Sequence, residues 1–172
     1  AIDSLWPKGA RIEVRGETHH LTLQAGGYTL RGIDFRVAHG DAIVLGGGLS
    51  LTRVKLHVPQ GGLYIGGAGT MAVIGSELRA SGGIHLGARR LQLQASKVFV
   101  DEGRFTMQDK ARVLLSSSLI EARDGFAAPH RSAMLMVGLS RISARSGALG
   151  FDAGGDLVCG SSQRAKGVSC SW

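Results

Sequence analysis

The chain is 172 residues long, contains 27 glycines and two cysteines, and carries a formal net charge of +7 at pH 7. This length suits a single domain with a buried core, and the lack of any apolar run of about 18 residues excludes a transmembrane helix. The excess of Lys and Arg over Asp and Glu, 20 against 13, either keeps the protein soluble or favours anionic partners such as acidic glycans, lipid headgroups or nucleic acid.

Glycine recurs at a nearly constant interval and organises the rest of the chain. The intervals are 21 or 22 residues, and the positions are Gly40, Gly61, Gly82, Gly103, Gly125 and Gly147. Self-similarity at a fixed period of this size is typical of a solenoid. The sequence therefore predicts one solenoid domain over residues 1–172.

Each repeat contains three short segments in which apolar residues alternate with polar ones, the period of a β-strand. In chain order these segments are residues 12–14, 21–23, 28–30, 35–37, 63–65, 71–73, 78–80, 84–86, 91–93, 98–100, 105–107, 113–115, 120–122, 149–151, 157–159 and 168–170. Three strands per repeat predict an all-β, three-sided parallel β-helix. About seven coils are expected, which at about 4.8 Å per stacked strand make a rod about 34 Å long.

The two ends depart from the repeat. Residues 1–11 are expected to cap the N-terminal coil, and residues 147–172 to form an atypical C-terminal coil, because the end coils of a solenoid need covering. An antiparallel sandwich or barrel is the main alternative fold, since it also has short, evenly spaced strands. It is disfavoured because the similarity recurs at every third strand and no Asn-Gly hairpin signal is present.

The two cysteines, Cys159 and Cys170, both lie in the expected last coil. A disulfide between them would staple the C-terminal edge and imply an oxidising compartment, the periplasm or the cell exterior. The alternative is two buried thiols. No further cysteine and no histidine lies near them, so neither a metal site nor a cofactor is expected.

Equivalent positions of successive coils stack into columns, so candidate binding residues are sought in columns. The outward column of the third strand contains Arg36, His57, Arg79 and Phe99, a set that we call the basic strip. A basic strip ending in an aromatic ring suits an acidic sugar chain or a phosphate group, although solvated surface residues are the simpler interpretation. On the first strand, Tyr64 and His85 face outward and are candidates for stacking on a sugar ring.

A neighbouring outward column alternates in sign over its first four members, which favours a structural role. Its members are Asp34, Lys55, Glu77, Lys97, Leu119 and Arg141.

The densest acidic region offers the only candidate catalytic site. Glu102 and Asp124 occupy equivalent corners of adjacent coils, with Arg104 and Arg123 nearby, and paired carboxylates are the groups that hydrolyse glycosidic bonds. Turn hydrogen bonding and ion pairing with the arginines explain the same residues structurally. Coils without insertions form a rod and not a cleft, which disfavours an enzyme.

From the coil period and the three-strand pattern, residues 12–168 resemble the right-handed parallel β-helix superfamily, which includes pectate lyases and the passenger domains of bacterial adhesins. The resemblance implies the architecture and its right-handed winding. No catalytic motif of these families can be placed on the chain.

Three functions follow as hypotheses. The first is a non-catalytic exported module that binds an acidic polysaccharide or lipopolysaccharide along the basic strip. The second is an assembly or adhesin-type module that stacks through its solenoid ends, with outward Leu114, Leu119 and Met136 adding an apolar side contact. The third is a small polysaccharide lyase or hydrolase. Nucleic acid is a disfavoured partner, because aromatic residues are few.

Overall fold

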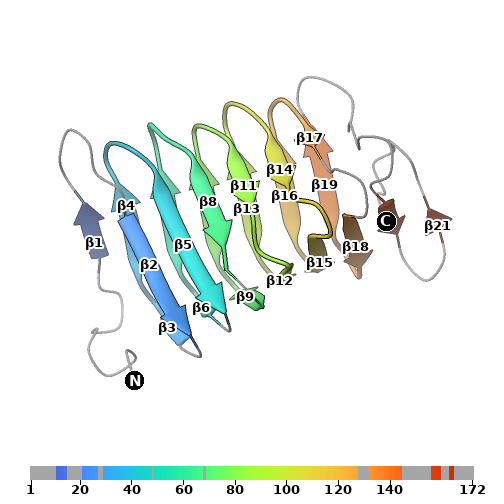
Figure 1. Ribbon diagram of the computed structural model, residues 1–172, viewed down its shortest axis with the longest axis horizontal. Coiled ribbons are helices and arrows are strands. Elements are labelled where there is room, and N and C mark those ends of the chain that lie inside the picture. The colour runs from blue at the N-terminus through green and yellow to red at the C-terminus, as the bar shows by residue number, and fades with distance from the viewer. Residues whose placement is uncertain are drawn as a thin grey trace.

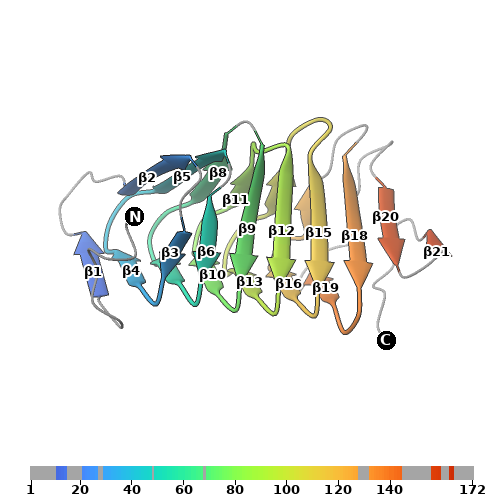
Figure 2. The same cartoon turned by 90° about the horizontal axis from the view of Figure 1, so that it is seen from below.

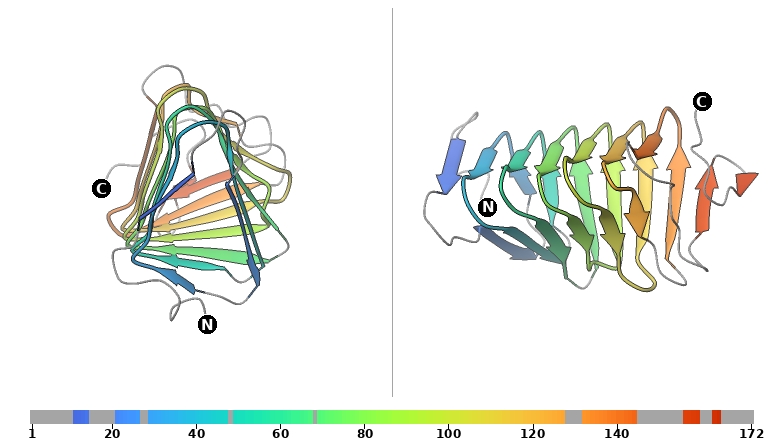
Figure 3. Two further views of the ribbon diagram at one scale, coloured as in Figure 1. Left: turned by 90° about the vertical axis from the view of Figure 1, so that its left-hand side faces the viewer. Right: turned by 90° about the horizontal axis from the view of Figure 1, so that it is seen from above.

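The computed structural model describes residues 11–14, 21–26, 29–47, 49–67, 69–127, 132–144, 156–159 and 163–164. Across these residues the regular elements are strands, and they wind into three sheets along one axis (Figure 1). Seen along that axis, the three sheets enclose a three-sided interior (Figure 3). The predicted all-β, parallel β-solenoid is confirmed.

Each coil contributes one strand to each sheet, in the order B, C, A. Sheet A contains β1 (Arg11–Val14), β4 (Asp34–Val37), β7 (Lys55–Val58), β10 (Glu77–Ala80), β13 (Lys97–Val100), β16 (Leu119–Ala122) and β19 (Arg141–Ala144). Sheet B contains β2 (Leu21–Gly26), β5 (Ala42–Gly47), β8 (Leu63–Gly66), β11 (Ile84–Leu86), β14 (Phe105–Met107) and β17 (Phe126–Ala127). Sheet C, which faces the viewer in Figure 2, contains β3 (Thr29–Arg31), β6 (Ser50–Thr52), β9 (Thr70–Ile74), β12 (Arg90–Gln94), β15 (Arg112–Ser116), β18 (Ala133–Val137), β20 (Asp156–Cys159) and β21 (Gln163–Arg164).

The number of turns is smaller than predicted. Across the described residues the strands make about five turns, against about seven coils expected. At the N-terminal end β1 belongs to sheet A and, within the described residues, is not part of a complete triplet; at the C-terminal end β21 pairs antiparallel with β20. Of the predicted terminal segments, residues 12–14 lie in β1 and residues 157–159 in β20, whereas 149–151 and 168–170 lie outside the described residues. The expected cap, residues 1–11, lies outside the described residues except for Arg11, and so does most of segment 147–172.

The core is a stack of apolar side chains from all three sheets. Alternation along each strand directs these side chains inward, as Leu91 and Leu93 of β12 do. The rings of Phe105 and Phe126 are tilted by 47° relative to each other, with their centres 5.9 Å apart. The prediction that Met136 faces outward is wrong. Met136 is fully buried because it stands in register with Leu115, an inward residue of the preceding coil.

The recurring glycines from Gly40 to Gly125 lie at the corner between sheets A and B, and Gly147 lies outside the described residues. A close approach of successive coils requires one of these glycines. A Cβ on Gly61 would lie 2.6 Å from the carbonyl carbon of Gly40 and 2.7 Å from Oδ1 of Asp41. Gly103 meets a different demand, because its φ of 91° lies in the left-handed region. The repeat thus reflects both steric contact and backbone conformation.

A ladder of buried serines runs along the corner between sheets C and A. It consists of Ser76, Ser96, Ser118 and Ser140, and in each step the backbone N–H of one serine donates to Oγ of the serine one coil further on, at 3.1–3.2 Å. The Oγ of Ser96 in turn lies 2.8 Å from the carbonyl oxygen of Gln94. This serine ladder satisfies the polar backbone where the chain turns inside the core.

Candidate functional site

The basic strip is a continuous column on the outer face of sheet A. Arg36 of β4 pairs in register with His57 of β7, His57 with Arg79 of β10, and Arg79 with Phe99 of β13. Parallel strands stack about 4.8 Å apart, so these four side chains emerge side by side. The fold therefore brings together the residues that the sequence pattern predicted to be neighbours.

Arg79 is already engaged within the protein. Its Nε donates to Oδ2 of Asp101 at 2.7 Å and its Nη2 to Oδ1 at 2.8 Å, a bidentate pair. The guanidinium carbon also lies 5.3 Å from the ring centre of Phe99. The Asp101 hydrogen bonds raise the pKa of Arg79 and balance its charge. What remains for a ligand is an oriented guanidinium with its Nη1 donors unused by Asp101.

His57 adds no full charge at neutral pH. Burial lowers the pKa of His57 below its usual value of 6.5, and the charges of Arg36 and Arg79 lower it further. The neighbouring column of alternating charges is also in register, Lys55 with Glu77 and Glu77 with Lys97. The outer face of sheet A is consequently closer to charge balance than the sequence alone suggested.

The acidic corner is joined by turn contacts. Oδ2 of Asp124 accepts a hydrogen bond from the backbone N–H of Gly103 at 3.0 Å, which ties two coils together. Oε1 of Glu102 lies 3.9 Å from Nη1 of Arg123, and both side chains are exposed, 75% and 54%. Such an exposed pair contributes little stability. Arg104 lies instead beside sheet B, where it lines a depression.

That depression, of about 390 Å³, lies on the outer face of sheet B around the predicted aromatic pair. Its lining includes Asp41, Tyr64, Gly83, His85, Arg104 and Thr106. The rings of Tyr64 and His85 stack on each other, with centres 5.3 Å apart and planes inclined by 12°, and Nδ1 of His85 lies 2.8 Å from Oγ1 of Thr106. One face of each ring is thus covered by the other and is closed to a sugar.

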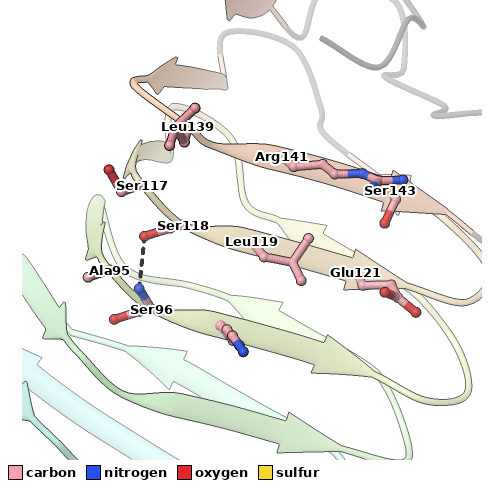
Figure 4. Close-up of a pocket in the computed structure, with 10 residues that line it drawn as sticks. Ala95, Ser96, Ser117, Ser118, Leu119, Glu121, Leu139, Arg141 and Ser143 are labelled. Carbon is pink, nitrogen blue, oxygen red and sulfur yellow. Dashed lines mark hydrogen bonds between the residues drawn. The ribbon is translucent and has the colours of Figure 1, made fainter. Parts of the chain in front are cut away.

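A second depression, of about 330 Å³, lies over sheet A near its C-terminal end (Figure 4). Leu119 and Glu121 of β16 and Arg141 of β19 project into it, and Leu139, 81% exposed, stands at the corner. Its lining mixes both signs of charge with an apolar side chain. The mixture does not select an anion over a cation.

Two features of the fold were not predicted from the sequence. The serine ladder was signalled by serines spaced 20, 22 and 22 residues apart, a regularity masked by the many other serines. The second feature is a group of cations at the corner between sheets B and C. Arg90 and Arg112, the first residues of the neighbouring strands β12 and β15, stand in register there. These arginines begin the second strand of their coils, whereas the predicted columns belong to the first and third strands.

Among the described residues, no group of three His, Cys, Asp or Glu side chains is placed to hold a metal ion. Nor is any helix within these ranges long and apolar enough to cross a membrane. The predicted disulfide cannot be placed, since Cys170 and the side chain of Cys159 fall outside what the structure describes.

The fold and the outer faces define a class, the three-sided parallel β-solenoids. Comparison with known proteins adds no narrower assignment: no protein-family description, curated protein or solved structure gives a significant match to the chain.

Proposed function

We propose that the protein is a non-catalytic, exported β-helix module that binds an anionic glycan or another anionic polymer of the cell envelope. One observation carries the proposal: outward side chains stand in register from coil to coil, as Arg36, His57 and Arg79 do. A polymer repeats its charged groups along one axis, and the solenoid face repeats its outward side chains along one axis in the same way. A net charge of +7 sets the sign of the preferred partner.

The residues proposed to contact the polymer extend over two faces. On sheet A they are Arg36, Arg79 and Phe99, with His57 as a neutral hydrogen-bonding neighbour at pH 7. On sheet B they are Tyr64 and His85. Acidic polysaccharide and lipopolysaccharide are the partners with this chemistry, and an exported location, which the proposed disulfide would favour, is where they are met.

The non-catalytic part of the proposal follows from the acidic corner. Asp124 accepts a turn hydrogen bond from Gly103, and Glu102 faces Arg123 on an exposed edge. A general acid for glycoside cleavage works best in a buried, apolar pocket, and the side chain of Glu102 is exposed. Likeness in activity to the polysaccharide lyases of the β-helix superfamily therefore remains the weaker proposal.

The test is binding to an array of neutral and acidic glycans at about 50 and about 300 mM salt, which differ in electrostatic screening. We expect binding to acidic glycans only, lost at the higher salt. No detectable binding to any glycan of the array at low salt would contradict the proposal. Turnover of a uronic-acid polymer that Glu102→Gln abolishes would contradict its non-catalytic part.

A further inference from the structure

Four cations gather where the chain passes from sheet B to sheet C. Arg90 and Arg112 are the first residues of β12 and β15, which lie side by side in Figure 2, and they pair in register. Arg89 and Lys110 belong to the corners that lead into these strands, and all four side chains are exposed. We call this set the basic edge.

The basic edge differs from the charged columns of sheet A in having no matching acids. Arg90 and Arg112 are flanked in their column by uncharged Thr70 and Ala133, and Asp109 is the one acid in these two corners. Within the described ranges, no ion pair joins any of the four cations to a carboxylate. Like charges directly opposite each other on a sheet are destabilising, so this arrangement costs stability that nothing inside the described fold offsets.

The backbone of the second corner adds a separate cost. Residues 108–111 form a turn in which the N–H of Ala111 donates to the carbonyl of Gln108 at 3.1 Å, and Lys110 adopts a φ of 63°. That left-handed conformation suits glycine and costs a lysine about 1 kcal/mol. The N–H of Arg112 donates to the carbonyl of Arg89 at 2.9 Å, so the two corners are directly joined. A strained lysine therefore stands on a corner next to two arginines that have no acidic partner among the described residues.

Among the described residues, the outer face of sheet C beyond the basic edge contains hydrogen-bonding amides and no aromatic ring. Gln92 and Gln94 project outward from β12, and Leu114 and Ser116 occupy the matching positions of β15. Single-stranded nucleic acid is bound by stacking its bases on aromatic side chains, which the described part of this face does not offer. Amides beside guanidinium groups instead suit a chain bearing both hydroxyls and oxyanions.

We propose that the basic edge, Arg89, Arg90, Lys110 and Arg112, is the oxyanion-binding site for an acidic polysaccharide. The inference rests on the proposed function. It places the main contact between the protein and the polysaccharide at the corner where sheet C begins, and not on sheet A. The guanidinium forks of Arg90 and Arg112 bind carboxylates of successive sugars, Lys110 adds a point charge, and Gln92 and Gln94 bind hydroxyls.

The first experiment measures the affinity for a polyuronate, polygalacturonate, in the parent and in two double variants of equal charge change. Arg90→Gln with Arg112→Gln removes the basic edge, and Lys55→Gln with Lys97→Gln removes two exposed cations of sheet A as the control. We expect the first pair to weaken binding about tenfold or more, the loss of one to two charge-assisted hydrogen bonds, and the control to weaken it less than about threefold. Smooth lipopolysaccharide serves as a second ligand, and tighter binding to it than to polygalacturonate would overturn the choice of carboxylate over phosphate.

The remaining outcomes separate this site from the proposed function. If the parent binds polygalacturonate and both double variants weaken it equally, or neither does, the basic edge is overturned while the proposed function stands. If the parent binds no acidic glycan at low salt, both fail.

A second pair of variants tests the strained lysine. Lys110→Gly is expected to raise the melting temperature, because it relieves the left-handed φ, and to weaken polygalacturonate binding. Ala95→Gly relieves a similar φ of 48° at the corner between sheets C and A, away from the basic edge, and should raise the melting temperature without affecting binding. Unchanged affinity in a folded Lys110→Gly variant would exclude Lys110 from the site.

Discussion

At the scale of single residues, the positions that matter most are those where one coil touches the next. Gly61 has no room for a Cβ, because the carbonyl of Gly40 and the carboxylate of Asp41 lie where that atom would be. A Cβ on Gly75, by contrast, would meet only Cγ of Arg53 at 3.8 Å, an ordinary contact, but the φ of Gly75 is 57°. Glycine is thus required at Gly61 because a side chain has no room there, and at Gly75 because the backbone is left-handed.

These two glycines give a matched prediction. Gly61→Ala should lower the free energy of unfolding by about 2–3 kcal/mol, since backbone atoms must move apart, whereas Gly75→Ala should cost about 1 kcal/mol for the left-handed conformation alone. Chemical denaturation of both variants measures the difference. Equal losses would mean that the contact with Gly40 does not limit how closely the coils stack.

His57 predicts how stability depends on pH. Its pKa is lowered in the folded protein by burial and by Arg36 and Arg79, so the unfolded chain binds the proton more readily. The stabilising effect of neutral His57 is present above the unfolded pKa of about 6.5 and is lost as the pH falls below it. We expect the free energy of unfolding to decrease from pH 7 to pH 5 less steeply in His57→Gln than in the parent; parallel profiles would contradict this.

At the scale of elements, the serine ladder holds the corner between sheets C and A. The Oγ of Ser96 accepts from the N–H of Ser76 at 3.2 Å and lies 2.9 Å from the carbonyl oxygen of Val73, so one hydroxyl joins adjacent coils. Both serines are buried. The ladder allows polar backbone to turn within an apolar interior without unpaired groups.

Ser96→Ala should therefore lower the free energy of unfolding by about 1–3 kcal/mol, because it leaves the buried N–H of Ser76 without its acceptor. Ser50→Ala, on the outer face of sheet C, should change it by less than about 0.5 kcal/mol. Urea denaturation of the two variants makes the comparison. A neutral Ser96→Ala would show that the ladder fills space and does not secure the corner.

At the scale of the whole molecule, the strand pairing in sheet C changes from parallel to antiparallel at the C-terminal end. β21 pairs antiparallel with β20, Val158 with Arg164 and Cys159 with Gln163. An unpaired strand at the end of a solenoid is a template for another chain, and covering it prevents edge-to-edge association. This arrangement bears on the alternative proposal that the protein assembles through its ends.

Arg164→Pro should uncover that edge, because proline removes a backbone donor from β21. We expect sedimentation velocity to show concentration-dependent association of the variant and a monomeric parent. Association of the parent itself would instead favour the assembly proposal, and a strictly monomeric variant would mean that β21 is not what protects the edge.

The architecture was determined by the sequence alone. Inward and outward positions alternate along each strand, and the glycine period sets the length of a coil, so residues such as Leu91, Val113 and Ile84 could be assigned to strands and to the core from their spacing. The basic strip followed from the same register. Both predictions, the strand assignment and the register of the basic strip, are confirmed because residues one repeat apart in a solenoid become neighbours in adjacent coils.

The tertiary structure decided which of the aligned charges are available. Asp101 lies 22 residues from Arg79 and in another column, so its bidentate pairing was not visible in the alignment of Arg36, His57 and Arg79. The number of complete turns, the inward Met136 and the juxtaposed Arg90 and Arg112 were likewise settled only by the folded chain. The physical reason is the same in each case. Sequence periodicity determines which residues share a column, whereas the pairing of side chains from different columns and corners depends on their distance in three dimensions.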